Sequence, residues 1–401
     1  MKIDDQVKIL SDGANFPCGD EEFKEKLKLS VKNKKPLCVK YGADPSAADI
    51  HLGHCVPIFK LKQFQDFGHQ VIFIIGDFTA RIGDPSGKTK TRPTLTTQQV
   101  KDNAKTYQNQ IFKILNPDQT KIVFNNDWFE KMQFSKVIDI AARYNVARML
   151  ERNDFSDRFK NQESITILEF FYPLIQAYDS VYLKNDIELG GTDQEFNFLL
   201  ARDLMKSYEL DPQIVMTMPL LVGTDGVKKM SKSYDNYIGI DENPIDIYGK
   251  VMSVSDETLF HYNELFLCLN KEMCVSKELL QTYPYQAKHD FAFQITMKFQ
   301  GEKEAVKARD HFKQVHQNRL VPEEIEEYLL SQSDMSDMDI VRFVQNSGLV
   351  SSQSEGRRLL SQNAIKIDGK KVSLETPLSV QDGSVLQVGK RRFKKIRIQK
   401  K

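Results

Sequence analysis

Two histidines and two lysines carry the chemistry that stands out in this sequence. His51 and His54 flank Gly53 at the start of a predicted helix, where unpaired N–H groups and the helix dipole favour an anion. Lys229 and Lys232 lie in a segment rich in glycine, aspartate and serine, and lysines three residues apart can reach phosphate oxygens as flexible point charges. Such groups stabilise the negative charge that develops when a phosphate bond breaks. The four residues predict a nucleotide site, with solvated surface side chains as the alternative.

Two other candidate sites are weaker. His51 and His54 could be two of the ligands of a metal site. Zinc-binding helices, however, use histidines four residues apart together with a carboxylate, so we predict no metal site. The segment 83–89 resembles a phosphate-binding loop, but the first glycine of that motif would fall on Ile82. We interpret the segment as a tight turn, in which Asp84 either shapes the turn or binds a substrate amine.

Alternating strands and helices must position these residues. The pattern predicts a strand over 37–41 and a helix from about residue 53 to 67, with Pro57 in its first turn and Gly68 as its stop. The uninterrupted apolar run 71–75 is typical of a strand buried on both faces. Further strands are predicted at 121–124 and 187–189, with helices up to about residue 150 and over 193–204. The fold class is therefore α/β with a mostly parallel sheet, in which ligands bind at the carboxyl ends of the strands.

The remainder of the chain changes in character twice. Apolar residues follow helical spacing from residue 244 to about 330, and the polar segment 331–337 is the predicted linker to a last domain. From Val341 to Lys401 there are 14 Lys or Arg against 4 Asp or Glu, a net charge of +10, whereas the whole chain carries +1. The preceding 340 residues therefore carry −9. A basic end on an acidic body points to a polyanionic partner, with a solvated tail as the alternative.

The composition, 40% hydrophobic and 28% charged residues, is that of a globular protein. No apolar run reaches the ~18 residues of a membrane-spanning helix, and the polar N-terminus lacks the apolar segment of a secretory signal. The five cysteines are scattered without a CxxC pair, so neither a disulfide framework nor a zinc site is expected. We expect a cytoplasmic protein.

The two motifs together resemble a known class of enzymes. Residues 51–54 (HLGH) and 229–233 (KMSKS) stand in the order of the paired signatures of class I aminoacyl-tRNA synthetases. Segments 44–47, 76–88, 172–179 and 190–194 narrow the resemblance to the bacterial branch of the tyrosyl-tRNA synthetase family. The resemblance implies a Rossmann-like catalytic domain at 1–240, an all-helical tRNA anticodon-region domain at 241–330 and a small α+β domain at 338–401.

The resemblance also implies roles for individual side chains. Asp179 would accept a hydrogen bond from the phenol of tyrosine, and Asp84, Tyr172 and Gln176 would hold its amino group. The residues implied for ATP are Asp44, His51, Gly53, Gly191, Asp193 and Lys232. The residues implied for catalysis are His51, His54, Lys229, Lys232 and Gln194, of which Gln194 holds the reacting carboxylate and phosphate.

Three positions depart from the better-known branch of the family, which carries at the first of them a tyrosine that contacts the substrate phenol. This chain has Lys40 there, followed by Tyr41 in place of a cysteine, and it has Ser46 in place of a threonine. We predict that Lys40 lines the tyrosine site, where it either donates to the phenol oxygen or pairs with Asp179.

Residues 338–401 resemble the S-four-like RNA-binding module that is shared with a ribosomal small-subunit protein. Arg357 and Arg358 on a predicted helix and Lys366 on the following strand would form one basic face for an RNA backbone. The basic run 390–395 would extend this face.

These resemblances imply a tyrosine–tRNA ligase. The enzyme would activate tyrosine with ATP to tyrosyl-adenylate and transfer the tyrosyl group to tRNA(Tyr), with Mg²⁺ carried on the phosphates and no protein-bound cofactor. A tryptophanyl-type enzyme and a catalytically silent RNA-binding homologue are the alternatives. Asp179 and Gln176 argue against the first, and the complete set of catalytic histidines and lysines argues against the second.

The family works as a symmetric homodimer, and one apolar stripe is a candidate for the interface. Ile138, Ala142, Val146 and Met149 follow helical spacing. The stripe either faces a partner subunit or packs within its own subunit.

Overall fold

The computed structural model describes residues 3–45, 49–84, 96–318, 326–331, 338–374, 376, 378–389 and 392–399. Ser46, residues 85–89 of the turn predicted at 83–89, residues 332–337 of the linker predicted at 331–337, and the basic residues Lys390 and Arg391 lie outside the described residues. By its internal contacts the chain divides into two units, Met1–Arg309 and Asp310–Lys401. The finer division predicted at residue 240 stays a prediction.

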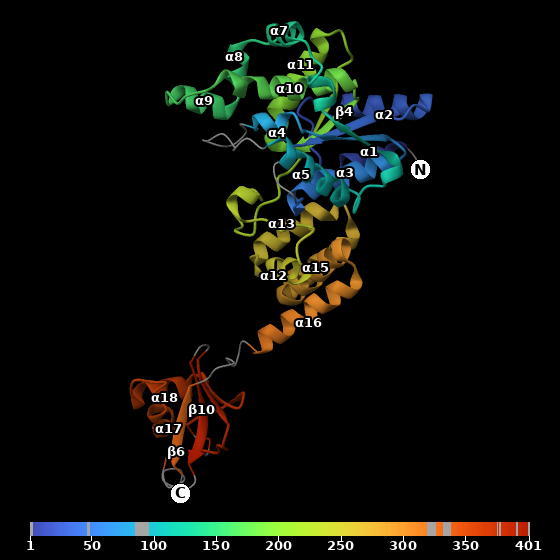
Figure 1. Cartoon of the computed structure of the whole chain (residues 1–401). Helices are drawn as coiled ribbons and strands as arrows, with labels where there is room; N and C mark the ends of the chain where they lie inside the picture. Colours follow the sequence, from blue (N-terminus) through green and yellow to red (C-terminus); the bar gives the residue numbers. More distant parts are fainter. Residues whose placement is uncertain are drawn as a thin grey trace. The chain divides into compact units, whose positions relative to one another are not determined.

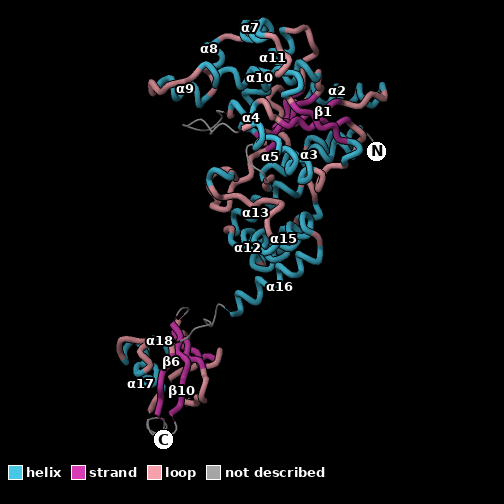
Figure 2. Tube along the Cα trace, viewed as in Figure 1, coloured by secondary structure: helices cyan, strands magenta, loops and turns pink. Residues whose placement is uncertain are grey.

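A five-stranded parallel sheet forms the centre of the first unit (Figures 1 and 2). Its order is β3-β2-β1-β4-β5. The strands are β1 (Cys38–Ala43), β2 (Gln70–Ile75), β3 (Thr120–Phe124), β4 (Ile187–Gly191) and β5 (Ile214–Met218). The strand order reverses between β1 and β4, and in such sheets a ligand binds outside the carboxyl ends of the strands at this switch point.

The strand–helix–strand unit predicted from the sequence is confirmed as β1, α3 (Leu52–Asp66) and β2. Gly68 has a φ of 82°, a conformation that suits glycine just after a helix. The placement of Pro57 in the first turn was wrong, because it is the sixth residue of α3. A proline there removes one backbone hydrogen bond. The helix continues through it because α3 is buried along most of its length, and such packing contributes more to helix stability than one bond.

The other helices complete the first unit. Those before and around the sheet are α1 (Ile3–Ser11), α2 (Glu21–Asn33), α4 (Thr79–Ile82), α5 (Thr97–Ile111), α6 (Asn126–Phe129), α7 (Phe134–Ala142), α8 (Val146–Met149), α9 (Asn153–Lys160), α10 (Ile167–Leu183) and α11 (Glu195–Ser207). The later ones are α12 (Pro244–Ser253), α13 (Asp256–Leu267), α14 (Lys277–Thr282), α15 (Pro284–Gln300) and α16 (Glu302–Asn318), which crosses the unit boundary. Short 3₁₀ helices are η1 (Pro117–Gln119), η2 (Thr192–Gln194), η3 (Lys232–Tyr234) and η4 (Lys271–Met273). Figure 1 shows α7 to α11 grouped at one end of this unit and α12, α13 and α15 grouped at the other.

In its described residues after α16, the second unit contains a mixed sheet with the order β6-β10-β9-β7-β8 and two helices. Its elements are β6 (Glu327–Ser331), α17 (Ile340–Asn346), α18 (Gln353–Ser361), β7 (Ile365–Ile367), β8 (Lys370–Lys371), β9 (Val385–Val388) and β10 (Arg392–Gln399). A helical interpretation up to residue 330 was wrong for β6, which pairs in parallel with β10. Leu330 of β6 joins the apolar core of this unit, and that burial comes from a strand more than 60 residues later in the chain.

None of the helices in the described part of the chain is both long and apolar enough to cross a membrane.

Candidate active site

A cavity of about 520 Å³ lies at the carboxyl ends of β1 and β4. It contains every residue that the sequence predicted for catalysis, ATP or tyrosine. These are Lys40, Asp44, His51, Gly53, His54, Asp84, Tyr172, Gln176, Asp179, Gly191, Asp193, Gln194, Lys229 and Lys232. The strand order predicts a site at this position, because side chains from β1, β4 and the segments that follow them meet at the switch point.

The two histidines lie at the start of α3. His51 caps the helix in an extended conformation, and Leu52 N–H donates to the Ile238 carbonyl oxygen at 3.0 Å. The rings of His51 and His54 are 3.8 Å apart, and the His51 N–H donates to His54 Nδ1 at 3.3 Å. Burial lowers the pKa of His51 well below its usual range, and His54 and the two lysines act in the same direction. His51 is therefore a neutral ring, and its buried Nδ1 has no hydrogen-bond partner among the described residues.

The lysine motif packs on the histidine motif. A side chain at Gly53 would come within 3.0 Å of His51 Nδ1 and 3.6 Å of Met230 Cβ, so glycine permits the close approach of the two segments. Lys229 Nζ lies 2.6 Å from Asp193 Oδ2, and Lys232 Nζ lies 3.2 Å from Asp49 Oδ2. Burial lowers the pKa of Lys232, against the attraction of Asp49. Both ammonium groups are thus held by carboxylates at the cavity, from which they can move to phosphate oxygens.

A buried carboxylate, Asp179 of α10, forms another part of the cavity wall. Trp128 Nε1 donates to Asp179 Oδ1 at 3.0 Å, and Asn125 Nδ2 donates to Oδ2 at 3.5 Å. Burial raises the pKa of Asp179 to about 7, and the positive charge of Lys40 is the main factor that opposes this rise. The carboxylate is therefore poised to accept a further hydrogen bond from a ligand hydroxyl.

Lys40 does not pair directly with Asp179, which was one of its two predicted roles. Its ammonium lies 3.0 Å from Glu188 Oε1 on the neighbouring strand β4, and both side chains are almost fully buried. Lys40 and Glu188 are aligned across the β1–β4 pair, so the pairing of the strands brings the two charges together.

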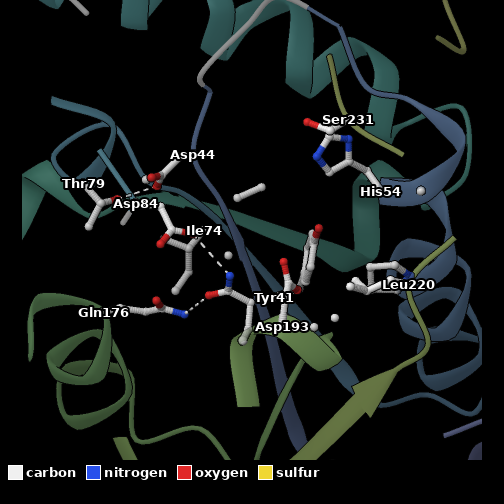
Figure 3. Close-up of a pocket in the computed structure, with 18 of the residues that line it drawn as sticks. Tyr41, Asp44, His54, Ile74, Thr79, Asp84, Gln176, Asp193, Leu220 and Ser231 are labelled. Atoms are coloured by element: carbon white, nitrogen blue, oxygen red, sulfur yellow. Dashed lines mark hydrogen bonds between the residues drawn. The ribbon is translucent and has the colours of Figure 1, made fainter. Parts of the chain in front are cut away.

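Amides and carboxylates line another part of the cavity. Gln194 Nε2 donates to Asp84 Oδ2 at 3.3 Å, and Gln176 Nε2 donates to Gln194 Oε1 at 3.5 Å. The Tyr172 hydroxyl donates to Asp44 Oδ2 at 2.8 Å. Figure 3 shows Asp44 and Asp84 on one side of the pocket and His54 on the opposite side. These polar groups are suited to an ammonium and a carboxylate, as in the backbone of an amino acid.

Several residues at the site were not predicted. Asn125 and Trp128 bond Asp179, Thr79 bonds Asp44 at 2.6 Å, Glu188 bonds Lys40, and Asp49 bonds Lys232. Trp128 is the single tryptophan of the chain, which is the one signal that the sequence offered.

The residues predicted for RNA lie on the second unit. Arg357 and Arg358 are exposed on α18, and Lys366 is half-buried on β7. Of the candidate dimer stripe in the first unit, Ile138, Ala142 and Val146 are exposed, whereas Met149 is buried in the core.

Comparison with known proteins identifies the family. Residues 32–317 match the family described as tRNA synthetases class I (W and Y), and residues 340–383 match the S4 domain. The chain is 47% identical over 396 residues to the tyrosine–tRNA ligase of Moorella thermoacetica, covering 98% of this chain and 95% of that protein. It is 47% identical over 402 residues to that of Thermotoga maritima, covering 99% and 98%.

Solved structures show the same fold. The tyrosyl-tRNA synthetase of Archaeoglobus fulgidus, complexed with L-tyrosine, matches with a TM-score of 0.60 and 21% identity over 77% of this chain and all of that one. The truncated mitochondrial enzyme of Aspergillus nidulans matches with a TM-score of 0.62 and 22% identity over 77% and 94%. The cavity with its HLGH and KMSKS motifs and the matches along the full chain lead to one conclusion: this protein belongs to the bacterial tyrosyl-tRNA synthetases, the class I enzymes that join tyrosine to its tRNA.

Proposed function

We propose that the cavity binds tyrosine and ATP together and acts as the active site of a tyrosine–tRNA ligase. In the first step a tyrosine carboxylate oxygen attacks the α-phosphorus of ATP, and the bond to the pyrophosphate breaks. In the second step a terminal ribose hydroxyl of tRNA(Tyr) attacks the tyrosyl carbonyl, and AMP leaves. Neither step needs a covalent nucleophile from the protein, so catalysis comes from positioning and charge stabilisation.

The tyrosine is held by groups of matching chemistry. Asp179, buried and already bonded by Trp128 and Asn125, accepts a hydrogen bond from the phenol hydroxyl. Asp84, Tyr172 and Gln176 surround the amino group, and Lys40 stands in the wall beside Asp179. A phenylalanine in this place leaves a buried carboxylate without its partner, which disfavours its binding.

ATP lies against the motif residues. Gly191 and Asp193 contact the ribose, Gly53 lets the nucleotide approach the backbone of α3, and Asp44 and Gln194 position the reacting groups. His51, His54, Lys229 and Lys232 stabilise the charge of the departing pyrophosphate. Mg²⁺ enters bound to the phosphates of ATP. Lys229 leaves Asp193 as the ribose binds, since both compete for one carboxylate.

The second unit supplies the contact with tRNA. Its net charge of +10 between Val341 and Lys401 suits a phosphate backbone, and Arg357, Arg358 and Lys366 are the proposed contacts.

The working protein is a cytoplasmic homodimer. Large apolar side chains are exposed on helices of the first unit that cluster in Figure 1, including Phe134 and Ile138 of α7, Val146 of α8 and Ile167 of α10. A surface of this kind is stabilised by a second copy of the chain.

One observation carries the assignment: a buried carboxylate suited to a phenol and the two phosphate-binding motifs line the same cavity. The test is amino-acid-dependent exchange of pyrophosphate into ATP, run separately with each of the twenty amino acids. We expect exchange with tyrosine alone. Exchange with tryptophan would assign the chain to the tryptophanyl type, and no exchange at all would make it a silent RNA-binding homologue.

A further inference from the structure

A buried ion pair forms part of the cavity wall beside Asp179. Lys40 and Glu188 are 1% and 3% exposed at their side chains, and their charged atoms are 3.0 Å apart. Both residues line the cavity together with Asp179 and Asn125. A buried pair of this kind is weak support for stability, because two charges must be removed from water, and apolar residues of the same volume often serve as well.

The two members of the pair differ in how completely they are bonded. Glu188 accepts from Lys40 at one oxygen and from Ser180 Oγ, at 3.2 Å, and Gln213 Nε2 at the other. Lys40 has three ammonium hydrogens, and Glu188 is its one bonded partner among the described residues. The carboxylate therefore already accepts three hydrogen bonds, while the ammonium retains unused donor capacity at the cavity.

The hydroxyl group of a phenol can be recognised in two ways: it donates one hydrogen bond, and its oxygen accepts hydrogen bonds through its lone pairs. Asp179, when ionised, can only accept. Its two oxygens already receive Trp128 and Asn125, and it can take the phenol hydrogen in addition. Asp179 alone therefore recognises any group with a hydrogen to donate at this position, whether it is a hydroxyl or an amine.

We propose that Lys40, held and charge-compensated by Glu188, donates to the phenol oxygen and selects a hydroxyl over other donor groups at the para position of the substrate ring. The inference rests on tyrosine being the substrate. Glu188 is a positioning residue, because it acts through Lys40. The pair keeps an ammonium at the pocket without adding net charge next to Asp179, whose ionisation is needed for the other half of the recognition.

The diagnostic substrate is 4-aminophenylalanine. Its neutral amino group donates a hydrogen bond to Asp179 as a phenol does. Its nitrogen lone pair, however, is delocalised into the ring and is a poor acceptor. Its second hydrogen would also face the Lys40 ammonium. A hydrogen bond to a charged group contributes enough to change a rate ratio roughly 10- to 100-fold. The kcat/KM of wild-type exchange should therefore favour tyrosine over 4-aminophenylalanine by about that factor.

The matched variants are Glu188→Gln and the double variant Lys40→Met with Glu188→Gln, which differ only in the ammonium and preserve side-chain volume. In the single variant, the kcat/KM preference for tyrosine over 4-aminophenylalanine should persist. In the double variant this ratio should fall to within about threefold of unity. The preference for tyrosine over phenylalanine should be largely retained there, because Asp179 is unchanged. A purely structural role of the pair would lower kcat/KM for all three substrates in proportion. That result, or a preference over 4-aminophenylalanine that survives in the double variant, would overturn the proposal.

A wild-type measurement covers the case in which the double variant does not fold. The isotope-edited Raman spectrum of bound, ring-labelled tyrosine reports whether the phenol oxygen donates, accepts or does both. We expect a phenol that does both, and a phenol that only donates would overturn the role of Lys40. Wild-type exchange with tyrosine tests the ligase function independently, so failure of that function and failure of this inference give different results.

Discussion

The buried carboxylate of Asp179 should make tyrosine binding depend on pH near neutrality. Burial raises the pKa of Asp179 from its ordinary 3.8 to about 7, with Lys40 opposing the rise. The group is then roughly 90% ionised at pH 8 and about 10% ionised at pH 6. Because the ionised form is the stronger acceptor for the phenol, the Kd of tyrosine should rise by up to about tenfold between pH 8 and pH 6.

Equilibrium dialysis of labelled tyrosine without ATP measures this directly. The control is Asp179→Asn, which keeps the shape of the side chain but does not titrate, and its weaker binding should be flat over the same range. Lys40 and Glu188 are the charged groups next to Asp179, and Glu188→Gln shows whether they contribute to the profile. A wild-type Kd that does not change with pH, or a profile that persists in Asp179→Asn, would refute the reasoning.

The same pKa has a consequence for stability. The unfolded state ionises near pH 4 and the folded state near pH 7, so the folded state binds the extra proton between these values. Stability is therefore lost as pH rises from about 4 to about 7, by about 4 kcal/mol at most. Asp179→Asn should raise the free energy of unfolding at pH 8, and the gain should be smaller at pH 5, as measured by denaturant unfolding. An equal gain at both pH values would contradict this linkage.

Further variants test the other parts of the site and the assembly. Lys232→Ala should slow single-turnover formation of tyrosyl-adenylate by roughly 100- to 1,000-fold and leave the tyrosine Kd within about twofold, and an equal loss of both would reject its role. Asp49→Asn should lower the KM for ATP by up to about fivefold, because Lys232 no longer leaves an ion pair, whereas a higher KM would show that Asp49 supports ATP binding. Val146→Asp should give a folded monomer in sedimentation, since this side chain is 61% exposed, and unfolding would place the stripe inside the subunit. A chain ending at residue 318 should keep tyrosine-dependent exchange but lose most tRNA charging and its steep salt dependence, and full charging would rule out the RNA role of the second unit.

The sequence predicted those parts of the fold and of the site that depend on residues close together in the chain. The run 71–75 formed a buried strand, Gly68 ended α3, and the HLGH and KMSKS motifs met at one cavity. Such motifs can be recognised because the chemistry requires a few residue types at short spacing, next to strand ends that the apolar pattern marks.

What could not be predicted depends on contacts between distant parts of the chain. Lys40 meets Glu188 only because β1 pairs with β4, and the two are 148 positions apart. Trp128 and Asn125 follow β3, yet they bond a carboxylate on α10. The five-residue strand β6 is stabilised by β10, far along the chain, so its local pattern was read as helical.

Isolation of the intermediate tests the central claim most directly. The full-length protein is mixed with labelled tyrosine, ATP and Mg²⁺, passed through a desalting column, and then given tRNA(Tyr). We predict that tyrosine and the adenylate moiety elute with the protein in equal amounts, and that tRNA releases AMP as the tyrosine becomes bound to the tRNA. Elution without tyrosyl-adenylate, or an adenylate that tRNA does not discharge, would contradict the assignment of this cavity as the site of tyrosine activation and transfer.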